Sequence, residues 1–84
     1  MAYSLVVTNR FDKDMKHLMP KEREISLNKI SEILENPHSY KQLSGALQGL
    51  HSARFGAFRI IFAVDESKKQ VILFTVRPRE RVYE

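Results

Sequence analysis

The chain has 84 residues, of which 14 are lysine or arginine and 10 are aspartate or glutamate, so its formal net charge at pH 7 is +4. This length predicts one domain spanning residues 1–84, and a basic chain favours anionic partners, either nucleic acid or an acidic protein. The content of 29% charged residues and the lack of a long apolar run exclude a membrane span. Without cysteine, metal-ligand spacing or the layout of a signal peptide, we expect no metal, no cofactor, no membrane partner and a cytoplasmic location.

The first predicted elements are a short strand and a short amphipathic helix. Branched residues make Tyr3–Thr8 a strand, and Thr8 or Asn9 then suits the N-cap of a helix. Apolar side chains recur there with helical spacing, at Phe11, Met15 and Leu18. Pro20 ends this helix, because the residue before a proline disfavours the helical conformation.

A second helix is predicted from Pro20 or Lys21 to Glu35. Proline suits the first turn of a helix, and the dipeptide Asn36-Pro37 would stop it. The core-facing stripe of this helix is expected to contain Leu27, Ile30 and Leu34, widened by Ile33 and Ile25. Almost no linker separates the two helices, so they form a hairpin that can cover one face of a sheet.

Three more strands are predicted after an irregular segment, Pro37–Gly49, that wraps the edge of the sheet. The stretch Leu50–Val64 contains two of them, joined at Gly56, and Gln70–Arg77 is the third. Their short connections predict an antiparallel meander. The fold class is therefore α+β, with the order β-α-α-β-β-β and the helical hairpin packed on one face of a mainly antiparallel four-stranded sheet.

Alternation of side chains along the strands assigns residues to the two faces of this sheet. The helices are expected to cover Phe58, Ile60, Phe62, Ile72, Phe74 and Val76. The opposite face is expected to carry Val71, Leu73, Thr75, Arg54, Arg59, Arg77 and, if the alternation continues past Pro78, Arg79. A charged side chain in so apolar a strand needs water, a partner or an anion. Several guanidiniums on one face predict a phosphate site, whereas His51, on the other face, is expected to be packed or exposed at an edge rather than catalytic.

Two segments of the sequence resemble the RelE/ParE toxin superfamily, on its RelE-like side. His51–Phe62 is similar to a strand pair of the form Tyr-basic-x-basic-x-Gly-x-Tyr-Arg-x-x-Tyr, and Arg79–Tyr83 is similar to the closing arginine, polar residues, valine and tyrosine of that family. In this chain Ser52 stands at the first basic position, His51 and Phe58 stand at tyrosine positions, and Pro78 stands at a histidine or lysine position. The resemblance to the family rests on both segments together, at this separation in the chain.

The resemblance implies a RelE-like fold and the toxin of a type II toxin–antitoxin pair. Such toxins are small ribonucleases that enter the ribosomal A site and cut the messenger RNA there. The implied partners are therefore a cognate antitoxin and the ribosome with its mRNA and rRNA. By position, the resemblance assigns catalytic roles to Arg54, Arg59, Arg79 and Tyr83. We expect further RNA contacts from Arg77, Arg81 and Ser52.

Cleavage of RNA by its own 2′-hydroxyl requires a base, stabilisation of charge on the phosphate and a proton for the leaving oxygen. Arginine forks suit the phosphate, but an arginine stays protonated and cannot be the base. Either Tyr83 supplies this function or substrate positioning does so together with a ribosomal or solvent group. Two other functions stay open: a ParE-like inhibitor of DNA gyrase without nuclease activity, and a catalytically weakened relative that only binds RNA or its antitoxin.

Overall fold

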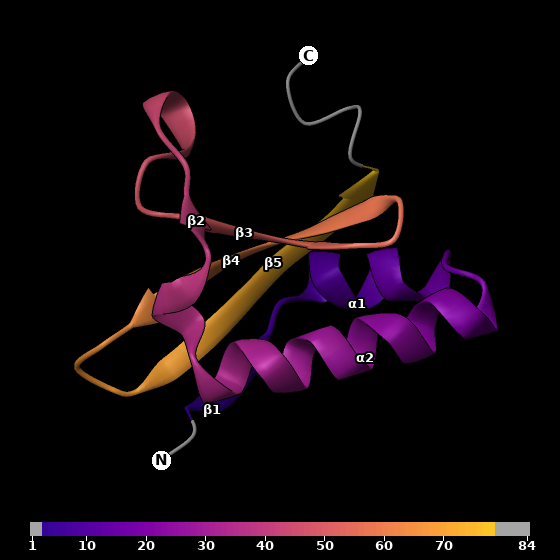
Figure 1. Cartoon of the computed structure of the whole chain (residues 1–84), viewed down its shortest axis with the longest axis horizontal. Helices are drawn as coiled ribbons and strands as arrows, with labels where there is room; N and C mark the ends of the chain where they lie inside the picture. The colour runs from indigo at the N-terminus through magenta and orange to yellow at the C-terminus, as the bar shows by residue number, and fades with distance from the viewer. Residues whose placement is uncertain (1–2, 79–84) are drawn as a thin grey trace.

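A computed structural model describes residues 3–78 of the chain, apart from the side chain of Leu47. Its elements are β1 (Ser4–Val7), α1 (Asn9–Lys16), α2 (Pro20–Glu35), η1 (Pro37–Ser39), β2 (Lys41–Gln42), η2 (Gly45–Leu47), β3 (His51–Phe55), β4 (Phe58–Asp65) and β5 (Gln70–Pro78). The strands form one sheet in the order β1-β5-β4-β3-β2, with β1 parallel to β5 and the other neighbours antiparallel. Both helices lie on the same face of this sheet, as Figure 1 shows. The predicted α+β class and its helical hairpin are confirmed.

The sheet has five strands, so the prediction of four missed one. The additional strand, β2, pairs with β3 at the edge of the sheet, where Lys41 lies opposite Ser52 and Gln42 lies opposite His51. Both residues of β2 are polar and exposed. A strand of two exposed polar residues has no alternating apolar pattern, which is the signal that predicts strands from sequence.

Capping groups fix the starts of both helices where the sequence predicts them, but α1 ends at Lys16, before Leu18 and Pro20 and so earlier than predicted. The Thr8 hydroxyl accepts a hydrogen bond from the backbone N–H of Phe11 at 3.2 Å and so serves as the N-cap of α1. At the start of α2, the backbone N–H of Met19 donates to the Glu22 carboxylate at 2.9 Å. Pro20 is the first residue of α2, where its missing N–H costs nothing.

The buried stripe of α2 differs in part from the predicted one. Ile30 and Ile33 are buried as expected, but Leu27 is 59% exposed and Ile25 is 40% exposed. Ser26 of α2 is instead completely buried and donates to the Met15 sulfur of α1 at 3.4 Å. A small side chain lets two helices approach closely, and a buried serine cannot be found from an apolar pattern.

A β-bulge in β5 corrects the predicted assignment of faces. Opposite Ile61 and Phe62 of β4 the pairing skips Phe74, so β5 has one extra residue there. The extra residue reverses the alternation, since a shift by one residue turns every side chain to the other face. The core therefore contains Val71 and Leu73, which were assigned to the opposite face, while Ile72 is half-buried and Phe74 is 38% exposed. Beyond the bulge, Val76 lies in the core as predicted.

On the edge away from β4, the second half of β5 is held by α1 rather than by another strand. The strand β1 ends at Val7, and beyond it the Asp14 carboxylate of α1 accepts hydrogen bonds from the Val76 N–H, at 3.0 Å, and from the Thr75 hydroxyl. Burial acts to raise the pKa of Asp14, but these two hydrogen bonds and a third from Arg10 outweigh it and lower the pKa. Asp14 thus fixes the strand end that carries Arg77.

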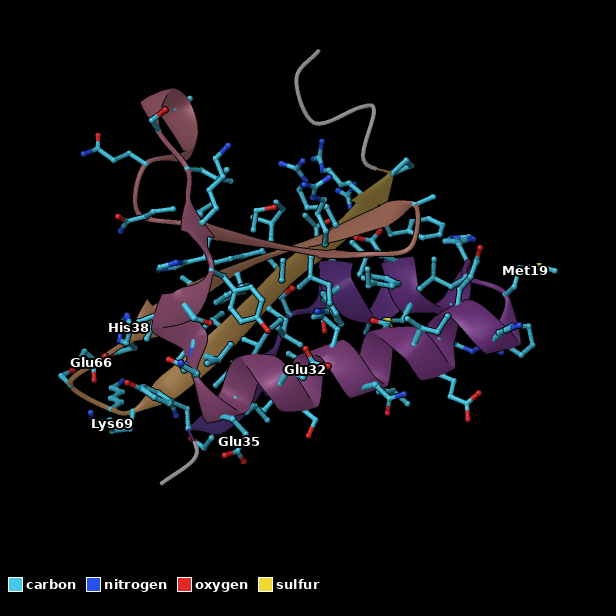
Figure 2. All side chains as sticks on the ribbon, viewed as in Figure 1. Met19, Glu32, Glu35, His38, Glu66 and Lys69 are labelled. Atoms are coloured by element: carbon cyan, nitrogen blue, oxygen red, sulfur yellow. The ribbon has the colours of Figure 1, made fainter. Side chains whose placement is uncertain are left out.

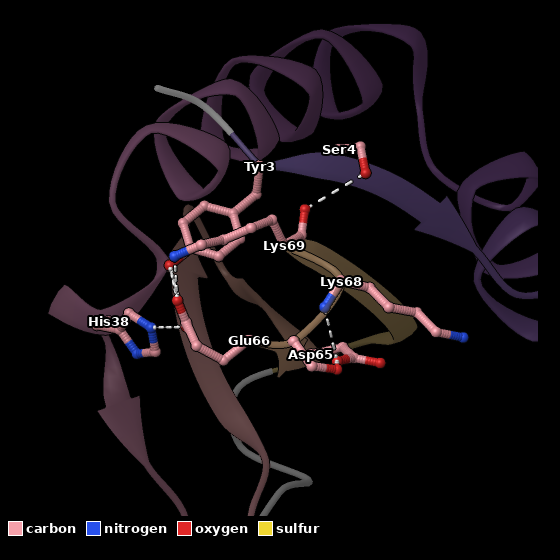
Figure 3. Close-up of polar contacts among 8 residues, drawn as sticks. Tyr3, Ser4, His38, Asp65, Glu66, Lys68 and Lys69 are labelled. Carbon is pink, nitrogen blue, oxygen red and sulfur yellow. Dashed lines mark hydrogen bonds and ion pairs between the residues drawn. The ribbon is translucent and has the colours of Figure 1, made fainter.

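A polar cluster around Glu66 lies at the other end of β5 from Arg77, at the turn between β4 and β5. The Glu66 carboxylate lies 2.5 Å from the Lys69 ammonium, 2.6 Å from His38 Nε2 and 2.8 Å from the Tyr3 hydroxyl. Figure 3 shows these side chains together. These three contacts lower the pKa of Glu66 to about 2. The cluster ties the turn between β4 and β5 to η1 and to the residue that precedes β1.

We predict that Glu66→Gln lowers the melting temperature at pH 7 and flattens its dependence on acid pH. Because the folded state depresses the pKa of Glu66 from 4.5 to about 2, its carboxylate stabilises the fold above pH 4.5, and this contribution is lost as the pH falls toward 2. Thermal unfolding measured from pH 7 to pH 2 tests this. The control is Glu35→Gln, an exposed carboxylate at the end of α2 (Figure 2). Equal pH profiles for Glu66→Gln and wild type would contradict the prediction.

Candidate nucleic-acid interface

Three arginines lie directly opposite one another across the centre of the sheet. Arg54 of β3 is the register partner of Arg59 in β4, and Arg59 is the register partner of Arg77 in β5. The residues beside them in sequence belong to the core under the helices: Ala53, Phe55, Ile60 and Val76. Alternation therefore places the three guanidiniums, which we call the arginine row, on the face away from the helices. The predicted convergence is confirmed for these three residues.

The arginine row concentrates positive charge at an electrostatic cost to the fold. Strands pair at about 4.8 Å, and like charges directly opposite each other across an antiparallel pair are destabilising. The central residue, Arg59, is only 6% exposed, whereas Arg54 and Arg77 are exposed. Among residues 3–78, no acid forms an ion pair with Arg54 or Arg77. Figure 2 shows nitrogen-tipped side chains gathered on this face of the sheet. An anion bound here would relieve the repulsion.

We predict that removing one charge from the arginine row stabilises the protein when no multivalent anion is present. Arg54→Gln should raise the free energy of unfolding by about 0.2–1 kcal/mol at low salt, because a like-charge pair across the strands is lost. Inorganic phosphate should then stabilise the wild type more than the variant at matched ionic strength, because only binding to the folded state contributes. Denaturant titration of both proteins and of the surface control Lys21→Gln tests this. An equal response of wild type and Arg54→Gln to phosphate would contradict it.

Two residues of β3 near the row, Ser52 and His51, lie on opposite faces of the sheet. Ser52 lies on the same face as Arg54, two residues earlier in β3, and is only 7% exposed. His51 lies on the helix face, where its ring stacks on Phe62 with centroids 5.2 Å apart, and its Nδ1 lies 3.3 Å from the Tyr40 carbonyl oxygen. His51 is thus a packed side chain, as predicted.

Part of the predicted site falls outside the part of the chain that the structure describes. Arg79, Arg81 and Tyr83, to which the sequence assigns catalytic or RNA contacts, all lie beyond residue 78. Within residues 3–78, no group of three histidine, cysteine, aspartate or glutamate side chains is arranged to hold a metal ion. In the same range, no helix has both the length and the apolar character needed to cross a bilayer.

One exposed cation near the row was not singled out from the sequence. Lys41 of β2 is the register partner of Ser52, and therefore shares the face of the arginine row. Only the pairing of β2 with β3 reveals this position, and that pairing has no sequence signal in a strand of two residues. The role of Asp14 has no sequence signal either, because its bonds to β5 join residues 61 and 62 positions apart.

Comparison with known proteins gives a consistent family. The model of a family described as "ParE toxin of type II toxin-antitoxin system, parDE" matches residues 5–83. The protein named Toxin RelE of Mycobacterium tuberculosis is 30% identical over 83 residues, which cover 96% of this chain and 86% of that protein.

Solved structures share the same fold. The toxin–antitoxin complex RelBE2 of Mycobacterium tuberculosis contains a chain that superposes with a TM-score of 0.86 at 23% identity, covering 94% of this chain and 100% of that one. The intact RelBE toxin–antitoxin complex of E. coli gives a TM-score of 0.79 at 25% identity, covering 95% of this chain and 100% of its own.

Proposed function

This chain belongs to the RelE/ParE toxin superfamily of type II toxin–antitoxin systems, and on that premise we propose that it is an endoribonuclease that cuts messenger RNA in the ribosomal A site. The observation that carries the proposal is the arginine row, three arginines in register on the face of the sheet away from the helices. Planar forks of this kind match the oxygens of a phosphate group. A phosphodiester is therefore the substrate group that this face suits best.

In the proposed reaction, the 2′-hydroxyl attacks the adjacent phosphorus and the 5′-oxygen of the next nucleotide leaves. Arg59, at the centre of the row, stabilises the negative charge that develops on the phosphate oxygens. Arg54 and Arg77 hold the same phosphate group or its neighbour from the two adjacent strands. Arg79 and Tyr83 act at the leaving group and in orienting the substrate, respectively.

The proposed base is not an arginine, because a guanidinium keeps its proton at neutral pH. Two routes remain for deprotonating the 2′-hydroxyl. Tyr83 can accept the proton if neighbouring cations favour its ionised form, or the ribosome can align the hydroxyl for attack with a ribosomal or solvent group as base. The second route would restrict cleavage to RNA held in the ribosome.

Membership of this toxin superfamily is also the basis for the partners that we propose. The solved relatives include complexes of a RelE toxin with a RelB antitoxin, and we infer an antitoxin partner for this chain as well. The ribosome with its mRNA and rRNA is the second partner, which places the protein in the cytoplasm. An acidic or amphipathic antitoxin would be attracted by the net charge of +4.

The alternative function is inhibition of DNA gyrase without cleavage of any nucleic acid. It is favoured by the description of the matching family, which is that of the ParE toxin. The arginine row favours the ribonuclease, because a protein inhibitor needs no fork-shaped contacts to a phosphate. A catalytically weakened relative that only binds RNA or its antitoxin is the third outcome, distinguished by binding without cleavage.

The decisive experiment adds the purified protein to ribosomes programmed with a defined mRNA and maps the new RNA ends. We expect one cut at the A-site codon, no cut in the same RNA without ribosomes, and no cut after preincubation with the product of a neighbouring antitoxin gene. Supercoiling by gyrase is assayed in parallel. Intact mRNA together with inhibited supercoiling would overturn the proposal in favour of the ParE-like function.

A further inference from the structure

The positive face extends beyond the arginine row to the edge of the sheet. Lys41 of β2 lies directly opposite Ser52 of β3, and Ser52 precedes Arg54 by two residues on the same face. The diagonal neighbours Lys41 and Arg54 therefore have Cβ atoms about 7–8 Å apart, within reach of long side chains. The cations thus continue across four neighbouring strands, from Arg77 through Arg59 and Arg54 to Lys41.

The residues around Lys41 leave its ammonium available. The residue opposite Lys41 is Ser52, which is only 7% exposed. Because its side chain is short, it does not separate Lys41 from the arginine row. Other lysines of this chain are engaged: Lys29 pairs with Glu32, and Lys69 pairs with Glu66. Within residues 3–78, Lys41 forms neither an ion pair nor a contact with an aromatic ring.

The extent of this face exceeds what one phosphate group requires. Three strand spacings of about 4.8 Å separate β5 from β2, so the cations span about 14 Å at the backbone. Lysine binds phosphate as a point charge on a flexible four-carbon stem, whereas arginine binds it with a rigid fork. The arginine row therefore suits the reacting phosphate, and a lysine at the edge suits a neighbouring phosphate that needs only to be held.

We propose that Lys41 binds a backbone phosphate adjacent to the one on the arginine row, so that a single RNA strand crosses the sheet from β5 toward β2. This inference rests on the proposed function in that the anion is RNA, and it assigns Lys41 a positioning role rather than a catalytic one. The path of the RNA across the sheet follows from the register, because the four cations lie in a row across the β-strands rather than along one of them.

The test measures binding of a short 2′-O-methyl RNA, which has no attacking hydroxyl and cannot be cut, as a function of salt concentration. For a single strand, each phosphate contact contributes about 0.7 to the slope of log K against log salt, which corresponds to about fivefold in affinity at 0.1 M salt. Lys41→Ala and Lys41→Gln should both lose this increment, and Lys41→Arg should keep it. Lys21→Ala, an exposed lysine on the helix side, should match the wild type.

A relocated charge makes the test specific to this position. In Lys41→Ala combined with Ser52→Lys, the ammonium moves to the register partner, and most of the lost slope should return. An unchanged slope in folded Lys41→Ala and Lys41→Gln, or weaker binding only to an acidic antitoxin, would overturn the proposal. Because this RNA cannot be cut, a failure of ribosome-dependent cleavage overturns the proposed function without affecting the result for Lys41.

Discussion

Replacing Arg59 by glutamine is expected to lower the rate of mRNA cleavage on programmed ribosomes by about 10²–10³-fold, the usual cost of removing one donor that stabilises a transition state. Arg59 occupies the centre of the arginine row, with an arginine on either side, and is 6% exposed. Its position is therefore fixed by the sheet, and neither neighbour can move into its place. Arg59→Lys keeps the charge but not the fork, so most of the loss should persist.

The measurement is a single-turnover cleavage assay with saturating ribosomes, which separates the chemical step from binding. Arg10→Gln is the matched control, because Arg10 is an exposed arginine on α1, in the helix layer. Circular dichroism and antitoxin binding show whether each variant is folded. Cleavage by folded Arg59→Gln within threefold of the wild type would contradict the assignment of Arg59.

Replacing Asp14 by alanine is expected to destabilise the fold by about 2–3 kcal/mol, because it leaves the Val76 N–H and the Thr75 hydroxyl without their acceptor. For a domain of this size that corresponds to a decrease in melting temperature of roughly 8–24 °C. Asp12→Ala is the control: its exposed carboxylate lies 3.7 Å from Lys16 on the same helix, and such a pair is worth little.

The contribution of Asp14 should also depend on pH. Its pKa in the folded state is lowered, so it stabilises the protein above its unfolded pKa, near 4, and the contribution is lost as the pH falls through the folded value. Urea titrations at pH 7 and pH 3 should therefore give a large difference between wild type and Asp14→Ala at pH 7 and a smaller one at pH 3. A difference independent of pH, or equal to that of Asp12→Ala, would contradict the role of Asp14.

Local signals in the sequence were sufficient for most of the fold. Helix starts depend on residues within a few positions of each other, and Thr8 and Pro20 predicted the starts of α1 and α2 correctly. The alternation of side chains along β3 and β4 also follows the predicted pattern. It places Arg54 and Arg59 on one face of the sheet, as the sequence predicts. The two segments that resemble the toxin family predicted the family correctly.

What the sequence could not reveal depends on contacts between distant segments. The bulge at Phe74 arises from the pairing of β5 with β4, and the strand itself alternates without interruption in its sequence. Buried Ser26 depends on how closely α1 approaches α2. Likewise, Lys41 belongs to the positive face only through its pairing with Ser52, and a two-residue strand contains no pattern that would predict this pairing.

The extra residue in β5 determines which of its side chains belong to the core and which to the proposed site. Counting by twos from Leu73, an unbroken strand would bring Thr75 and Arg77 under the helices and expose Val76 beside the arginines. A deletion of Phe74 alone would remove the bulge and leave Leu73 and Val76 on the core face and Arg77 in the arginine row, because the remaining residues already pair with β4 in regular register. With Phe74 present, only the bulge lets Val76 lie in the core while Arg77 joins the row, so the packing of β5 under the helices and the position of its arginine depend on the same local irregularity.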